Sequence, residues 1–116
     1  MIDYFKPTAQ MLGRWQPFHD GHIALFKEIL KKTGQVQIMV RTMPRSENNP
    51  FEFEEIKKRI EGKLQDYRDK FEVIKVANIT NICYGRDVGY KIEEIVLPKE
   101  IQEISATKIR NDKNYR

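Results

Sequence analysis

The sequence has few of the features that mark secreted, membrane-spanning or disulfide-stabilised proteins. It holds one cysteine, Cys83, in 116 residues, so no internal disulfide can form, and a single thiol is typical of a reducing compartment. The longest apolar run, residues 23–26, is far shorter than the about 20 residues that cross a bilayer. Residues 1–6 combine neither a basic start nor an apolar stretch, so we expect no signal peptide. These absences predict a soluble, cytoplasmic protein with no membrane partner.

Charge of one sign is never concentrated in the chain. Lys and Arg number 21 against 17 Asp and Glu, which leaves a net charge of +4, and no five like charges are consecutive. The densest cluster is residues 57–59, where Glu54 and Glu55 stand four residues before Lys58 and Arg59. Such pairs are typical of a solvated helix face, which is our interpretation of this cluster. The modest basic excess leaves a nucleic acid, an anionic metabolite or no charged partner open.

The composition and length are those of one globular domain. Apolar residues make up 40% and charged residues 33% of the chain. A chain of this size buries roughly two-thirds of its unfolded surface, which is enough for a core without metal or disulfide cross-links. No repeat and no Ser-, Gly- or Pro-rich linker divides the sequence, so we expect a single domain over residues 1–116.

Compact β-forming runs alternate with helical patterns along the chain. We expect strands over residues 9–12 (ending at Gly13), 36–40, 71–76, 79–84 and 92–97. We expect helices over residues 21–32 with Asp20 as the cap, from Asn49 and Pro50 to Leu64, and in a short segment that Ser105 caps. Strands that alternate with helices predict an α/β fold with a mostly parallel sheet flanked by helices.

The arginines point to the edge of this predicted sheet. In a parallel sheet the ligand crevice lies beyond the carboxyl ends of the strands. Five of the eight arginines follow predicted strands or lie in the closing helix: Arg14, Arg41, Arg45, Arg86 and Arg110. This placement predicts one anion-lined crevice rather than a generally basic surface.

The only two histidines, His19 and His22, lie where the first strand turns into the first helix. A helix start presents unpaired N–H groups and a positive dipole end, and Gly21 lets a ligand approach its backbone. Two imidazoles there can donate hydrogen bonds to phosphate oxygens. Two alternatives to a phosphate site are open. The histidines could be ordinary packed residues, or they could form half of a metal site to which Asp20 adds a ligand. A zinc site requires three or four protein ligands, so we expect no protein-bound metal.

Residues 104–110 form a second candidate site. Ser105 is a good N-cap, and Thr107, Lys108 and Arg110 follow within two turns. Taken alone, this segment is an ordinary helix start with a basic surface. Two helix starts, two imidazoles and several arginines at one sheet edge could hold a triphosphate between them.

Both segments resemble signatures of one enzyme family. Residues 13–22 (GRWQPFHDGH) resemble the HxGH signature of the nucleotidyltransferase superfamily, and residues 104–110 (ISATKIR) are similar to its late signature. The two stand in the family's order, one near each end of the chain. The resemblance implies a Rossmann-like fold and transfer of a nucleotidyl group from an NTP to a phosphorylated acceptor, with release of pyrophosphate. It also implies Mg²⁺ bound through the triphosphate.

The resemblance further implies roles for single residues. The residues implied to be catalytic are His19, His22, Thr107 and Arg110. The two histidines are implied to contact the triphosphate and stabilise the transition state, whereas Thr107 is implied to hold the β- and γ-phosphates with the help of Arg110. The residues expected to bind the nucleotide are Gly13, Arg14, Trp15, Gly21, Asp87, Ser105, Ala106 and Lys108. Those expected to bind the acceptor are Gln16, Arg41 and Arg45. Trp15 is expected at the crevice floor rather than in the plain core, and Cys83 is expected to be a small buried residue.

Two branches of the superfamily compete. The motif around His19 and residues 49–51 resemble adenylyltransferases of the nicotinamide mononucleotide type. The compact length, residues 85–87 and residues 97–99 resemble glycerol-3-phosphate cytidylyltransferases, although Gln16 replaces their Asp. We favour the cytidylyltransferase, with CTP as substrate, and keep ATP and the adenylyltransferase as the alternative.

A protein of another class also stays open. A catalytically inactive nucleotide- or RNA-binding module of the same fold is the further alternative, although no RNA-binding signature favours a nucleic acid. A small sheet with exposed edges is compatible with a homodimer.

Overall fold

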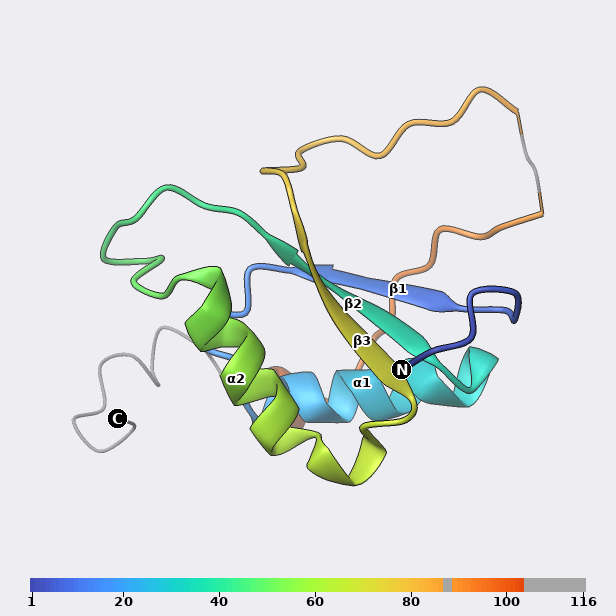
Figure 1. Cartoon of the computed structure of the whole chain (residues 1–116), viewed down its shortest axis with the longest axis horizontal. Helices are drawn as coiled ribbons and strands as arrows, with labels where there is room; N and C mark the ends of the chain where they lie inside the picture. Colours follow the sequence, from blue (N-terminus) through green and yellow to red (C-terminus); the bar gives the residue numbers. More distant parts are fainter. Residues whose placement is uncertain (87–88, 104–116) are drawn as a thin grey trace.

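Strands and helices alternate along the chain in the computed structural model, which describes residues 1–86 and 89–103. The elements are β1 (Ala9–Gly13), α1 (Asp20–Thr33), β2 (Val36–Arg41), α2 (Phe53–Lys63), a 3-10 turn η1 (Gln65–Tyr67), β3 (Phe71–Val76) and α3 (Lys99–Gln102). The strands form one parallel sheet in the order β1-β2-β3, with α1 and α2 on the same face (Figure 1). This arrangement confirms the predicted Rossmann-like α/β fold.

The core lies between this face of the sheet and the two long helices. Side chains alternate between the two faces of a strand, and the buried ones on β2 include Val36, Ile38 and Val40. They belong to one cluster with Phe26 of α1 and Ile60 of α2, both fully buried. The apolar stripes that predicted these helices therefore do form the core.

The other face of the sheet carries a row of hydrogen-bonded polar side chains. Gln10 Nε2 donates to Gln37 Oε1 at 2.9 Å, and Gln37 Nε2 donates to Glu72 Oε2 at 3.1 Å. The Tyr4 hydroxyl closes the row by donating to Glu72 Oε2 at 2.7 Å. This face therefore differs from that of a doubly wound sheet, in which helices cover both faces.

Two helix starts differ from the predictions. The N-cap of α1 is His19 and not Asp20, because the His19 side chain accepts the backbone N–H that a cap must satisfy. Helix α2 begins at Phe53 with Glu52 as its N-cap, so the predicted start at Asn49 and Pro50 is wrong. Asn49 instead exchanges two backbone hydrogen bonds with Ser46, at 3.1 and 3.3 Å, which hold this segment in a turn.

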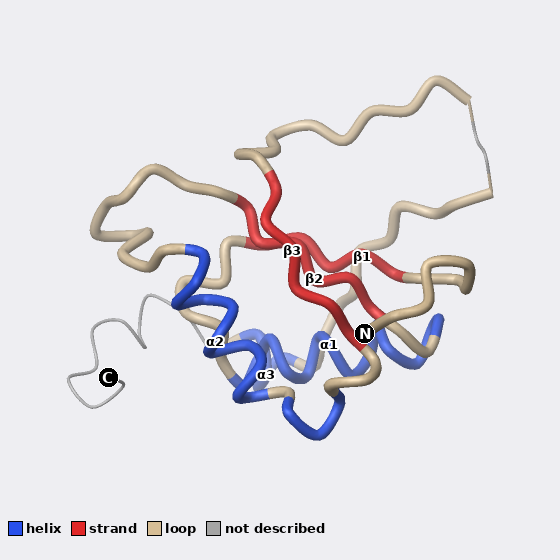
Figure 2. Tube along the Cα trace, viewed as in Figure 1, coloured by secondary structure: helices blue, strands red, loops and turns tan. Residues whose placement is uncertain are grey.

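The predicted strands over residues 79–84 and 92–97 are wrong. Between β3 and α3 the described residues form no strand, and the chain runs away from the sheet as a long loop (Figures 1 and 2). Ile82 is 61% exposed and Val96 is 74% exposed. A strand is stabilised by a hydrogen-bonded neighbour and by burial of one face, and these apolar side chains have neither in this arrangement. Cys83 lies in the same loop and is exposed, which corrects its predicted burial.

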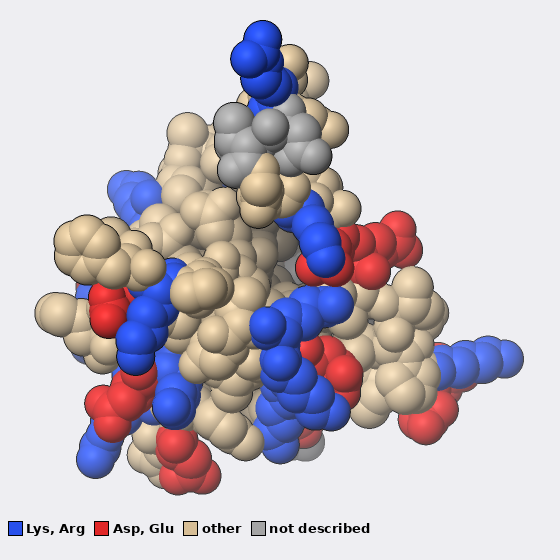
Figure 3. Space-filling model, turned by 90° about the vertical axis from the view of Figure 1, so that its right-hand side faces the viewer, with Lys and Arg blue, Asp and Glu red and all other residues tan. Residues whose placement is uncertain are grey.

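The surface shows how the basic excess is distributed. On the face drawn in Figure 3, lysine and arginine side chains are interspersed with aspartate and glutamate. Among the helices that the structure describes, none has both the length and the apolar character needed to span a bilayer.

Candidate phosphate-binding site

The loop between β1 and α1 (residues 14–19, the β1–α1 loop) is shaped by one buried indole. Trp15 has a positive φ of 54°, and its ring folds back over Gly13, where a Cβ would lie 2.6 Å from Trp15 Cζ2. Only glycine permits this approach without displacing the ring. Trp15 Nε1 donates to the Met39 carbonyl at 3.0 Å, which ties the loop to β2. Trp15 is thus part of the core and, through its contact with His22, also a wall of the site.

The two histidines hold each other in place at the start of α1. His19 Nδ1 accepts a hydrogen bond from the Gly21 backbone N–H at 3.1 Å. His22 Nδ1 accepts one from the His19 backbone N–H, also at 3.1 Å, and the two rings stack with their centroids 3.6 Å apart. Because both Nδ1 atoms act as acceptors, each neutral ring carries its proton on Nε2. The site therefore offers two parallel imidazoles with their Nε2–H groups as donors.

Gly21 completes this arrangement from the helix side. A Cβ at this position would lie 2.9 Å from His19 Cε1 and 3.5 Å from the Ile101 carbonyl oxygen. A larger residue would push the His19 ring out of its stack. The same contact shows that α3, which packs beside α1 (Figure 2), lies at this helix start.

Burial keeps both imidazoles neutral. Burial, together with a smaller effect of the neighbouring His19, lowers the pKa of His22 from its ordinary 6.5 to about 3. Burial also lowers the pKa of His19, against the opposing effect of Asp20, while Arg59 and Lys63 act in the same direction as burial. Neutral donors at the positive end of a 14-residue helix form a site suited to phosphate.

The structure also places the residues predicted to contact substrate. Arg14 is exposed at the end of β1, and its Nη1 donates to Asn49 Oδ1 at 3.3 Å. Gln16 is only 4% exposed, and its amide exchanges two hydrogen bonds with the Phe51 backbone, at 3.0 and 3.1 Å. Arg45 pairs with Glu52 at 2.8 Å. Gln16 therefore links the β1–α1 loop to the chain that leads into α2.

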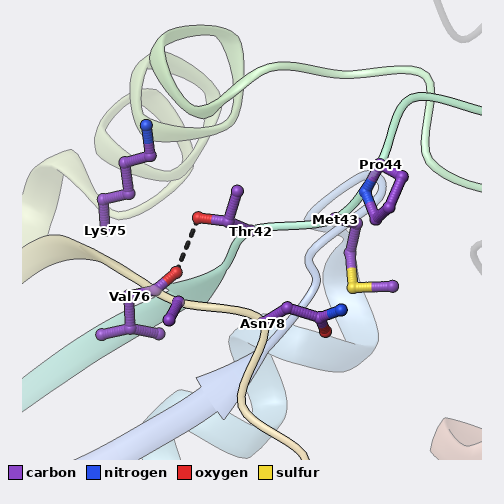
Figure 4. A pocket seen from close by; sticks show the side chains of 7 residues that line it. Thr42, Met43, Pro44, Lys75, Val76 and Asn78 are labelled. Carbon is purple, nitrogen blue, oxygen red and sulfur yellow. Dashed lines mark hydrogen bonds between the residues drawn. The ribbon is translucent and has the colours of Figure 1, made fainter.

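A pocket of about 590 Å³ opens at the carboxyl ends of β2 and β3 (Figure 4). It is lined by Thr42, Met43, Pro44, Lys75, Val76, Ala77 and Asn78. The Thr42 hydroxyl donates to the Val76 carbonyl at 2.6 Å, and Arg41 Nε donates to Asn78 Oδ1 at 2.8 Å. The strands are parallel and in register, so this pocket and the histidines lie on the same edge of the sheet.

Asp87 and the late motif lie outside the described residues, which leaves the predictions for Asp87, Ser105, Ala106, Thr107, Lys108 and Arg110 as predictions. Within residues 1–86 and 89–103, no three His, Cys, Asp or Glu side chains gather in a way that could hold a metal ion.

Two cations of α2 were missed by the sequence analysis. Arg59 Nε donates to the Phe18 carbonyl at 2.7 Å, and Lys63 Nζ lies 3.6 Å from Asp20 Oδ1. The interpretation of Arg59 as part of a solvated face is therefore wrong. Each of the two cations immediately precedes a fully buried residue, Ile60 or Leu64. That position beside the apolar stripe is the sequence signal that could have found them.

Comparison with known proteins adds to this geometry. Residues 11–112 match the family of cytidylyltransferase-like proteins. The nicotinamide-nucleotide adenylyltransferase of Methanococcus aeolicus is 34% identical over 73 residues, which is 61% of this chain and 42% of that protein. The enzyme of the same name from Methanococcus maripaludis (strain C5) is 32% identical over 73 residues and is covered to 43%. The chain thus spans less than half of the length of these relatives.

A solved structure resembles the fold. It is the crystal structure of a bifunctional NMN adenylyltransferase/ADP ribose pyrophosphatase from Francisella tularensis, complexed with AMP and a manganese ion. The similarity has a TM-score of 0.57 and 29% sequence identity, and it covers 62% of this chain and 23% of that chain.

The buried neutral His22 predicts a pH-dependent stability. Its pKa is about 3 in the folded chain against an ordinary value of 6.5, so between these pH values the unfolded chain binds the proton more tightly. We expect His22 to make the free energy of unfolding rise with pH in this window, by up to about 1.4 kcal/mol per pH unit. Urea unfolding at several pH values from 4 to 7 measures this slope. His22→Gln is expected to have a shallower slope, because the carboxylates titrate in both proteins, and equal slopes would contradict the burial of a neutral His22.

Proposed function

The chain belongs to the cytidylyltransferase-like family, and we propose that it is a nucleotidyltransferase that moves the adenylyl group of ATP to a phosphorylated nucleotide. The observation that carries the proposal is the stacked pair of His19 and His22 at the start of α1. The sequence favoured CTP, but both relatives described above are nicotinamide-nucleotide adenylyltransferases, and the solved neighbour was complexed with AMP. These comparisons support the adenylyltransferase alternative.

In this mechanism the protein positions the reactants and stabilises charge. A phosphate oxygen of the acceptor attacks the α-phosphorus of ATP in line, and the bond to the bridging oxygen breaks as pyrophosphate leaves. The Nε2–H groups of His19 and His22 donate to phosphate oxygens, and these hydrogen bonds strengthen as negative charge develops. Because the pKa of His22 is about 3, its ring stays neutral and keeps a donor on Nε2 near neutral pH.

The remaining phosphates need further groups. The late motif, with Ser105, Ala106, Thr107, Lys108 and Arg110, is proposed to bind the β- and γ-phosphates, and Arg14 and Trp15 to border the nucleotide. Ile101 precedes this motif by three residues in the sequence, and its carbonyl oxygen would lie 3.5 Å from a Cβ at Gly21. Mg²⁺ prefers phosphate oxygens and water, and we propose that it arrives with the triphosphate and neutralises its charge.

We assign the acceptor to the pocket at the ends of β2 and β3. Its volume of about 590 Å³ suits a small molecule, and it lies on the same sheet edge as the histidines. Arg41 reaches the rim through Asn78, and Arg45 lies in the following loop. Both can meet an acceptor phosphate, whereas Gln16 is proposed to brace the β1–α1 loop because its amide already pairs with Phe51.

The identity of the base can be tested by thermal unfolding with ATP, CTP, GTP or UTP in excess Mg²⁺. A nucleotide at 100 times its Kd stabilises the folded chain by about 2.7 kcal/mol, which raises Tm by on the order of 10 °C in a domain of this size. We expect the largest rise with ATP and none in His19→Ala. A larger rise with CTP would instead support the cytidylyltransferase.

Removal of one imidazole tests the mechanism. We expect His22→Ala to lower kcat with ATP and nicotinamide mononucleotide by about 10²–10³, the scale for losing one transition-state donor. Circular dichroism of the variant checks that the fold is retained. Turnover close to that of the wild type would rule out the proposed role of His22.

The acceptor assignment predicts a selective change in KM. Arg41→Gln should raise the KM for nicotinamide mononucleotide about tenfold or more, because a charge-assisted hydrogen bond to phosphate is lost, and should leave the KM for ATP nearly unchanged. Arg68→Gln removes the same charge ahead of β3, at the opposite edge of the sheet, and serves as the control. An equal effect in both variants would contradict the assignment.

A further inference from the structure

Helix α2 contacts the β1–α1 loop directly beside the histidines. Arg59 Nε donates to the Phe18 carbonyl at 2.7 Å, across 41 residues of sequence, and Phe18 is fully buried. The carbonyl of Phe18 and the N–H of His19 belong to the same peptide group. Arg59 therefore binds the peptide group that joins Phe18 to His19.

The two ends of this peptide group have different partners. Its oxygen accepts from Arg59, and its N–H donates to His22 Nδ1 at 3.1 Å. A guanidinium at the oxygen polarises the peptide and makes its N–H a stronger donor. The three groups thus form one chain of hydrogen bonds, which runs from Arg59 through the peptide to the ring of His22.

This chain of hydrogen bonds acts on both imidazoles. The backbone of His19 is fixed at its peptide group, and the His22 ring is held with Nδ1 as the acceptor and Nε2 as the protonated atom. We propose that Arg59 is a positioning residue, which sets the place of His19 and the tautomer of His22 without contacting substrate. The inference rests on the proposed function for its catalytic consequence but not for its structural one.

The surrounding charges are consistent with this role. The groups that influence the pKa of His19 are Asp20, Arg59 and Lys63, and the ring of His22 stacks on it. Asp20 favours the protonated form of His19, whereas Arg59 and Lys63 oppose it. Lys63 also lies 3.6 Å from the Asp20 carboxylate, at the helix start where an anion is expected. Burial is the main cause of the lowered pKa of His19, and the two cations of α2 act in the same direction.

Two variants and one matched control test the proposal. Arg59→Met removes the charge and the donor but keeps an unbranched stem, and Arg59→Lys keeps the charge and loses the Nε–H. Lys58→Met removes the neighbouring positive charge from the exposed side of the same helix. Nitrogen NMR of the imidazoles reports the tautomer of each ring, and only two histidines contribute signals.

We expect Arg59→Met to shift the His22 ring nitrogens towards a mixture of tautomers and to raise the pKa of His19. We expect its kcat to fall about 10²-fold, the cost of a misplacement of about 1 Å, with a much smaller change in the KM for ATP. Arg59→Lys should recover part of kcat, and Lys58→Met should match the wild type in every measurement.

Wild-type ring signals together with an unchanged kcat in Arg59→Met would overturn the proposal, as would equal changes in Lys58→Met. If Arg59→Met does not fold, the ring signals of Arg59→Lys decide instead, and wild-type signals there would overturn it. If the wild-type chain transfers no nucleotidyl group, the proposed function fails, while the tautomer measurement still decides whether Arg59 positions the histidines.

Discussion

The site depends on the reciprocal hydrogen bonds between the backbone and the two imidazoles at the start of α1. His19 satisfies the Gly21 N–H, and His22 satisfies the His19 N–H, so the rings replace the Ser, Thr or Asp that normally cap a helix. The same bonds fix which nitrogen of each ring is protonated. In the proposed function, the pair of side chains that caps the helix therefore also recognises the phosphates. Any change that improves the cap without an imidazole removes the donors.

Close packing then determines which residues can surround this pair. Gly13 is required by the Trp15 ring, and Gly21 is required by the His19 ring. Trp15 in turn packs against His22 in a T-shaped arrangement, with the ring centroids 4.7 Å apart and the ring planes at 79°. The aromatic wall buries His22 and lowers its pKa, so packing and protonation state have one cause. Packing therefore links Gly13, Trp15, Gly21 and the two histidines around the β1–α1 loop.

Local patterns predicted what local interactions determine. The three observed strands and the apolar faces of α1 and α2 follow from runs such as residues 36–40 and from the spacing of Ile56, Ile60 and Leu64. The strand predicted over residues 79–84 also had β-forming residues such as Ile79 and Tyr84, but its formation depends on a neighbouring strand that the sequence does not reveal. Likewise, Arg59 was predicted on the solvated face because Glu55 stands four residues before it. Its actual partner is the Phe18 backbone carbonyl, 41 residues away, which the spacing of charged residues cannot indicate.

If the proposed function holds, the distribution of charge in the site has a catalytic rationale. The neutral donors His19 and His22 lie at the start of α1. The nearby cations already have partners, because Arg59 donates to the Phe18 carbonyl and Lys63 pairs with the Asp20 carboxylate. A contact that stabilises the bound triphosphate as much as the transition state does not raise kcat, whereas one that strengthens in the transition state does. In the proposed reaction, the hydrogen bonds from the neutral imidazoles strengthen as negative charge accumulates on the phosphate oxygens. In the proposed mechanism Arg59 and Lys63 act by holding neutral groups in place rather than by binding the anion themselves.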